Sequence, residues 1–169
     1  MTVQVEDYSP HDERIWNEEL EEFVPDRIFD AHIHMIAHRH LPEPVRSTTT
    51  WGEAGFETLV AWSRRLYPNR ETHFLVLGSP VPGIDVDGHN SWAIEQLAAD
   101  PASRMNRLVT PDCRPEDIER DIVEHGFIGL KPYRLFSVTG DIAECRIHEF
   151  LPHEQLELAD RYGYEKRFL

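Results

Sequence analysis

Short apolar segments and amphipathic segments alternate four times along this chain, and this alternation limits the possible fold more than any other feature. Four segments have the length and apolar content of strands, at residues 27–34, 73–78, 107–110 and 127–131. Each precedes a segment with helical spacing of apolar residues, at residues 51–66, 91–99, 115–126 and 154–162. This order predicts an α/β fold with a parallel sheet, in which each helix crosses over the sheet between two strands.

Two regions flank the alternating part. Residues 1–26 are acidic, and Ile15, Trp16, Leu20 and Phe23 recur at roughly helical spacing, which predicts an N-terminal helical segment docked on the domain. After residue 163 the pattern requires a fifth apolar strand, yet half of residues 164–169 are charged. Strands buried on both faces are rarely charged. We therefore expect a helical segment at 1–26, a partial β/α barrel at 27–163 and an aberrant tail at 164–169.

The net charge excludes several classes of partner. The chain has 17 Lys and Arg against 31 Asp and Glu, a formal net charge of −14. Such a charge repels nucleic acid and anionic membrane surfaces. No apolar run approaches the roughly 20 residues of a membrane span, and the N-terminus lacks the basic-then-apolar layout of a secretory signal. We expect a cytoplasmic protein with a small-molecule substrate, no nucleic acid and no membrane.

The first predicted strand carries a polar stripe. Side chains alternate along a strand, so we expect Asp30, His32 and His34 on one face and apolar residues on the other. Two imidazoles about 7 Å apart along one strand can converge on a cation. Asp30 would then hold an imidazole by its other nitrogen. The alternative is a pair of histidines hydrogen-bonded in a barrel interior or solvated at a sheet edge.

Lys131 ends the fourth predicted strand and is expected on the same face as Phe127 and Gly129. Its ammonium group is a candidate contact for an anionic substrate, since ligands collect at the carboxyl ends of parallel strands. The alternative is a lysine that extends into solvent at the rim of the sheet.

Three residues in the loops are further candidates for substrate binding. Tyr133 and Arg134 follow the fourth strand, where a guanidinium can bind a substrate carboxylate. His89 is predicted in the loop after the second strand, facing the pocket. For Tyr133 and Arg134, a solvated position at the rim is the alternative.

The stretch Phe29–His34 resembles the first-strand motif of the amidohydrolase superfamily, metal-dependent hydrolases on a distorted (β/α)8 barrel. Residues 125–133 resemble the fourth-strand segment of its amidohydrolase-related branch, which also contains metal-dependent decarboxylases of aromatic or unsaturated acids. The resemblance spans about residues 26–163. It implies that His32 and His34 ligate a divalent metal, with zinc as the expected ion. In some branches a carbamylated lysine at the position of Lys131 bridges two metals.

The same resemblance implies ligands that these residues do not supply. In the family, a histidine on the fifth strand, often another on the sixth, and an aspartate on the eighth complete the site, and the aspartate typically shuttles protons. A TIM-type barrel takes about 250 residues. We therefore expect an incomplete barrel from a truncated form, with the proton-relay aspartate beyond the C-terminus and both edges of the sheet unpaired.

Three functional hypotheses follow. The first is a metal-dependent hydrolase that cleaves an amide, ester or lactone with metal-activated water. The second is a metal-dependent decarboxylase that uses the same site. The third is a catalytically inert fragment or interaction module that self-associates through its open sheet edges. Because two histidines and one carboxylate are few ligands, we expect weak metal affinity and negligible turnover from this chain alone.

Overall fold

Four parallel strands form the single sheet of the computed structural model, which describes residues 8–49 and 52–163. They are β1 (Arg27–His34), β2 (Glu71–Leu77), β3 (Arg104–Leu108) and β4 (Gly129–Lys131). The spatial order β1-β2-β3-β4 follows the chain order, and all three pairings are parallel. The predicted α/β class is therefore confirmed, and the arrangement is compatible with part of a β/α barrel. The predicted tail at 164–169 lies outside the described residues.

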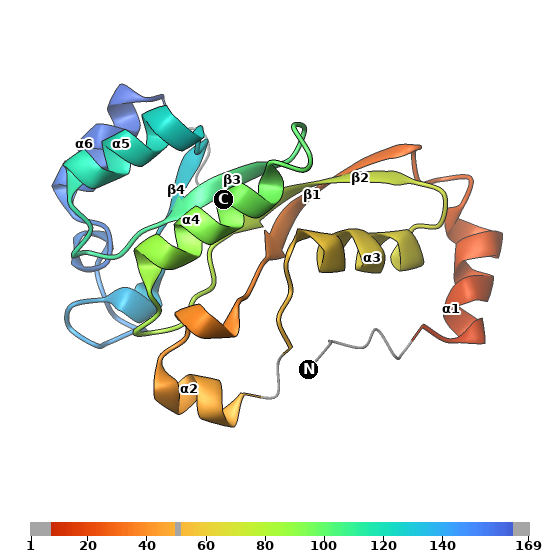
Figure 1. Ribbon diagram of the computed structural model, residues 1–169, viewed down its shortest axis with the longest axis horizontal. Helices are drawn as coiled ribbons and strands as arrows, with labels where there is room; N and C mark the ends of the chain where they lie inside the picture. Colours follow the sequence, from red (N-terminus) through yellow and green to blue (C-terminus); the bar gives the residue numbers. More distant parts are fainter. Residues whose placement is uncertain (1–7, 50–51, 164–169) are drawn as a thin grey trace.

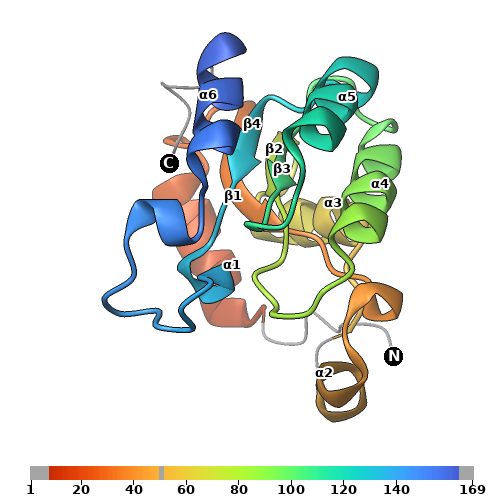
Figure 2. The same cartoon turned by 90° about the vertical axis from the view of Figure 1, so that its left-hand side faces the viewer.

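One helix crosses over the sheet after each strand. These helices are α3 (Phe56–Leu66), α4 (Val86–Leu97), α5 (Pro115–His125) and α6 (His153–Arg161). They pack on one face of the sheet, where they share one hydrophobic cluster with the strands, and Figures 1 and 2 show the arrangement of these elements. Their ends carry local signals: the Asp85 side chain accepts the Gly88 N–H at the start of α4, and Gly126 ends α5 at φ 73°.

The first of these helices begins later than predicted. Its expected start at residue 51 lies outside the described residues, and α3 begins at Phe56 behind Gly55. The preceding residue Ala54 forms an antiparallel bridge with Ile36, just after β1. That bridge holds the chain extended, so the helix begins only after it.

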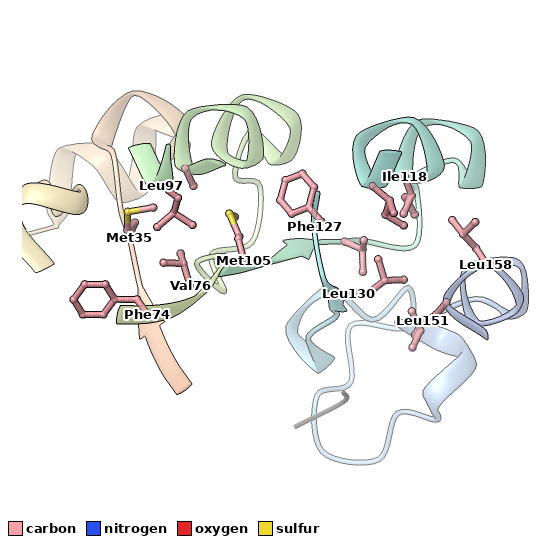
Figure 3. Close-up of a cluster of buried hydrophobic side chains, with 14 of the residues drawn as sticks. Met35, Phe74, Val76, Leu97, Met105, Ile118, Phe127, Leu130, Leu151 and Leu158 are labelled. Atoms are coloured by element: carbon pink, nitrogen blue, oxygen red, sulfur yellow. The ribbon is translucent and has the colours of Figure 1, made fainter. Parts of the chain in front are cut away.

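The main hydrophobic core lies between the sheet and these helices. Phe74, Val76, Met105 and Leu130 project from the strands toward residues of α3 to α6, and Figure 3 shows this cluster. Phe127 joins the same cluster from the segment before β4. The prediction that Phe127 shares a face with Lys131 is therefore wrong, because the strand begins only at Gly129.

The N-terminal segment lies where β1 and β2 begin (Figure 1). It consists of α1 (Pro10–Ile15) and a π-helical turn, η1 (Trp16–Leu20). Trp16 is buried against Tyr67, whereas Leu20 is 36% and Phe23 83% exposed. The predicted apolar face therefore does not dock as a whole. In the π-turn the Glu21 N–H bonds to the Trp16 carbonyl, five residues back, which rotates the later residues away from the sheet.

Short helices fill the remaining loops. They are η2 (His38–His40), α2 (Glu43–Thr48), η3 (Arg134–Phe136) and η4 (Ile147–Glu149). A second apolar cluster, Leu41, Val81, Ile84 and Leu108, packs beneath the loops that follow the first three strands. Within residues 8–49 and 52–163, no helix has the length and apolar character that spanning a membrane requires.

Candidate functional site

The first strand contains a β-bulge that decides which side chains share a face. Asp30 pairs with Phe74 and Ile33 pairs with Val76. Two residues of β1 therefore lie between these pairs where β2 has only one, so β1 contains one extra residue. Laterally paired residues point to the same side of a sheet, and Phe74 and Val76 belong to the helix-covered core. Asp30 is therefore on the helix side, whereas His34 is on the opposite, inner face. The predicted common face for Asp30 and His34 is wrong, because the extra residue reverses the alternation.

His32 and His34 nevertheless lie side by side. Their ring centroids are 5.3 Å apart at an interplanar angle of 68°. The bulge thus separates Asp30 from the pair without separating the two imidazoles. His32 is exposed and His34 half-buried, so the pair is accessible from solvent.

The carboxyl end of β2 holds the His34 ring in place. Its Nδ1 lies 3.1 Å from the Leu77 carbonyl oxygen and 3.2 Å from that of Gly78. Carbonyl oxygens only accept, so Nδ1 carries the proton and Nε2 keeps its lone pair. This is the arrangement found in metal-binding histidines, where the second ring nitrogen donates to a backbone carbonyl.

Asp30 stabilises the backbone of the site and not an imidazole. Its Oδ1 accepts the backbone N–H of His32 at 3.0 Å. The structure therefore differs from the predicted contact with a histidine ring. The carboxylate instead satisfies an N–H group within the bulge, where the ladder is interrupted.

The surroundings of His34 favour the neutral form of its ring. Burial lowers its pKa most, and the neighbouring His32 and Lys131 lower it further, against the opposing hydrogen bonds to the Gly78 and Leu77 carbonyls. A neutral imidazole is the form that binds metals. The strand register places Lys131, predicted to bind substrate, on the same inner face as His34, since it follows by two residues the Gly129 that pairs with Asn106.

The inner face continues sideways from His34 as a row of paired residues. His34 pairs with Leu77, Leu77 with Asn106 and Asn106 with Gly129. A Cβ on Gly129 would lie 2.6 Å from the Asn106 Oδ1, so glycine makes room for that amide. Asn106 is buried, and its Oδ1 has no hydrogen-bond partner among the described residues. Sequence reasoning missed Asn106, because the predicted third strand began one residue after it.

Lys131 and Tyr133 support this face from β4. Lys131 pairs with Leu108, and its Nζ lies 5.0 Å from the centre of the Tyr133 ring. Burial lowers the pKa of Lys131 and raises that of Tyr133. The Tyr133 hydroxyl donates to the Gly78 carbonyl at 2.8 Å, the same oxygen that faces His34 Nδ1. Tyr133 therefore helps to position the histidine, whereas the sequence predicted a contact with substrate.

Arg134 and His89 lie elsewhere. The exposed Arg134 guanidinium bonds to Cys145 Sγ and the Ala143 carbonyl, within the loop that follows β4. His89 is fully buried in the first turns of α4, and its Nε2 accepts the Ser79 N–H at 3.3 Å. Burial, assisted by His40 and His34, lowers the pKa of His89 to about 4. The predicted pocket-facing loop position of His89 is wrong, because α4 begins at Val86.

The donor set of the site is small. Within residues 8–49 and 52–163, no group of three or more histidine, cysteine, aspartate or glutamate side chains is placed to hold a metal ion. The two imidazoles fit a divalent cation as two of the usual four ligands. They supply half of a tetrahedral site and leave the other positions to water or to further ligands.

Comparisons of the chain with protein-family models, with curated proteins and with solved structures return no match. The functional interpretation therefore rests on the geometry of these residues and on the sequence resemblance of residues 26–163.

Proposed function

We propose that His32 and His34 bind a divalent metal ion, zinc above all, and that this half-site belongs to a metal-dependent hydrolase of the amidohydrolase type on a (β/α)8 barrel. The observation that carries the proposal is the anchored pair of rings. Two imidazoles lie 5.3 Å apart near the carboxyl end of the first strand, and the His34 Nδ1 faces backbone carbonyls. Catalytic sites of β/α barrels collect at this end of the strands.

The chemistry follows from the donors. A divalent ion held by imidazoles would lower the pKa of a bound water to about 7 and would polarise a carbonyl group. This chain would supply two imidazole nitrogens as ligands, and the carbonyls of Leu77 and Gly78 set the tautomer of His34. Lys131 adds a positive charge to the same face, which favours an ester, amide or lactone substrate that also carries a carboxylate.

The test is metal binding to the purified chain. We expect Zn²⁺ titration calorimetry to give micromolar or weaker affinity, because two protein ligands leave half of the coordination sphere to water. His32→Ala and His34→Ala should each reduce that affinity by about tenfold or more. His125→Ala is the matched control, because His125 is an exposed histidine at the end of α5 and should leave binding unchanged. Equal binding by all three variants would refute the metal half-site.

Decarboxylation of a metal-bound acid is the second candidate, and Lys131 favours it. Lys131 lies on the same inner face as His34, two residues beyond Gly129 on β4, so its ammonium group can attract a carboxylate toward the proposed metal position. A zinc-loaded sample should be assayed on ester, lactone and amide substrates and, separately, for CO₂ release from aromatic and unsaturated acids. Turnover in only one of the two assays decides between the reactions.

A further inference from the structure

His73, near the start of β2, has a ring that is held at one nitrogen and unpaired at the other. Its Nδ1 lies 2.8 Å from the Asp100 Oδ2. A carboxylate only accepts, so Nδ1 carries the proton and Nε2 keeps its lone pair. This Nε2 is buried and has no hydrogen-bond partner among the described residues. Buried polar atoms are nearly always paired, so an unpaired one indicates a binding role.

Asp100 is itself fixed in the loop between α4 and β3. Its Oδ1 accepts the Ala102 N–H at 3.0 Å, and its Oδ2 also accepts from the Ser103 hydroxyl. The Ser103 Oγ in turn accepts the Phe74 N–H of β2 at 2.8 Å. The His73 ring is therefore held in one orientation. A carboxylate that fixes the tautomer of a histidine in this way is the usual support of a metal-binding imidazole.

Glu71 supplies a carboxylate oxygen next to this nitrogen. Residues two apart on a strand point to the same face, so Glu71 and His73 project together from β2. The Glu71 Oε1 lies 3.5 Å from His73 Nε2, and its Oε2 lies 3.3 Å from Arg27 Nε on β1. The first of these contacts is not a hydrogen bond. Two acceptors this close repel each other unless a cation lies between them.

The separation of the two acceptor atoms suits a tetrahedral metal ion. Zinc lies about 2.1 Å from imidazole nitrogens and carboxylate oxygens. Two atoms 3.5 Å apart that both lie about 2.1 Å from one ion form an angle of about 113° there, close to the tetrahedral angle. Both residues line a pocket of about 420 Å³, which has space for the waters that would complete the coordination.

We infer that Glu71 and His73 bind a divalent transition-metal ion of the zinc type. Asp100 and Arg27 are the positioning residues that hold the two ligands. Imidazole with carboxylate suits zinc, whereas Ca²⁺ and Mg²⁺ prefer oxygen ligands alone. The site lies at the amino end of β2, where residues of β/α barrels serve stability, so the ion stabilises the fold. It does not depend on the proposed function, because the histidine pair of that site lies near the carboxyl end of β1.

Zinc titration calorimetry of the double variant His32→Ala/His34→Ala tests the inference, because this background lacks the ligands of the proposed catalytic site. We expect it to bind one zinc ion per chain with micromolar affinity. Glu71→Gln in this background should lower the affinity at least about tenfold, because an amide oxygen replaces the carboxylate ligand. Glu57→Gln is the matched control, because Glu57 is exposed on α3 and should leave the affinity unchanged. The inference is overturned if the double variant binds no zinc or if both glutamine variants bind it equally.

NMR of the histidine ring nitrogens in the wild-type protein keeps the test decisive if a variant fails to fold. Zinc should shift the Nε2 resonance of His73, while Nδ1 keeps its proton toward Asp100. An Nε2 resonance that does not move would overturn the inference. Zinc binding that depends on His32 and His34 but not on Glu71 supports the proposed function and removes this inference. Binding that depends on Glu71 but not on those histidines does the reverse.

Discussion

The carbonyl oxygen of Gly78 faces donors from two side chains of the candidate site. His34 Nδ1 lies 3.2 Å from it and the Tyr133 hydroxyl 2.8 Å. A backbone carbonyl just after β2 therefore sets the tautomer of His34, the proposed ligand. A backbone group of this kind cannot be recognised from a motif of side chains in the sequence. Tyr133 is linked to His34 through this shared oxygen, so we expect it to position the proposed ligand without contacting a metal itself.

Tyr133→Phe tests this arrangement. Loss of the hydroxyl removes one hydrogen bond and should lower the free energy of unfolding by about 1 kcal/mol in urea denaturation. Zinc affinity should change by less than in His34→Ala, because the carbonyls of Leu77 and Gly78 still accept from Nδ1. A loss of zinc binding as large as that of His34→Ala would instead place the hydroxyl at the metal.

Protonation of His89 should destabilise the fold in acid. Its pKa is about 4 in the folded protein against 6.5 in an unfolded chain, so the unfolded state binds more protons between these values. Stability is therefore full above pH 6.5 and falls as the pH drops toward 4, by about 3 kcal/mol for this group. Urea denaturation at a series of pH values measures this slope.

His89→Gln supplies the comparison for that slope. Glutamine can accept the Ser79 N–H but does not titrate, so the fall in stability between pH 6.5 and 4 should be smaller than in the wild type. His125→Gln is the control for the replacement of a histidine at an exposed position. Identical slopes for all three proteins would show that His89 does not titrate on unfolding.

At the scale of the elements, Gly78, which directly follows β2, lies closer to the end of β3 than a side chain at residue 78 would allow. A Cβ on Gly78 would lie 2.4 Å from the Leu108 Cβ. This contact is close to the backbone, so a small rotation of a side chain cannot relieve it. Glycine at residue 78 therefore permits the close approach of the segment after β2 to the end of β3.

Gly78→Ala should lower stability by about 3 kcal/mol, at the upper end of the usual range for overpacking. It should also weaken zinc binding, because the Gly78 carbonyl moves relative to His34. Gly55→Ala is the control, since its new Cβ would meet the end of the flexible Gln96 side chain at 2.8 Å. Urea denaturation and zinc titration of both variants measure the loss of stability and the loss of zinc affinity. Equal losses in Gly78→Ala and Gly55→Ala would contradict the packing argument.

The start and end of a helix could be predicted accurately where residues next to them in the sequence determine them. α5 was predicted almost to the residue, because Pro115 starts it and Gly126 ends it within a few residues of chain. α4 was predicted to start five residues late, because the capping role of Asp85 was not recognised, and His89 was consequently assigned to a loop. The bulge in β1 could not be predicted, because it exists only in the pairing with β2.

At the scale of the whole molecule, charge should limit stability. The net charge of −14 at pH 7 produces self-repulsion in the compact state. Added NaCl shortens the range of that repulsion, so the urea midpoint at pH 7 should rise between low and moderate salt. Near the isoelectric point of about 5.0 the same addition should have little effect. A midpoint that falls with salt at pH 7 would show that attractive ion pairs outweigh the repulsion.

The sequence by itself determined the α/β class, the parallel order of the strands and the presence of two histidines near the end of the first strand. These features depend on local periodicity and on short-range caps, which each segment carries within itself. Only the tertiary structure decided that Asp30 turns away from the pair, that the Gly78 carbonyl fixes His34 and that His89 is buried. Each of these depends on contacts between residues far apart in the chain, which are defined only when the strands pair and the helices pack.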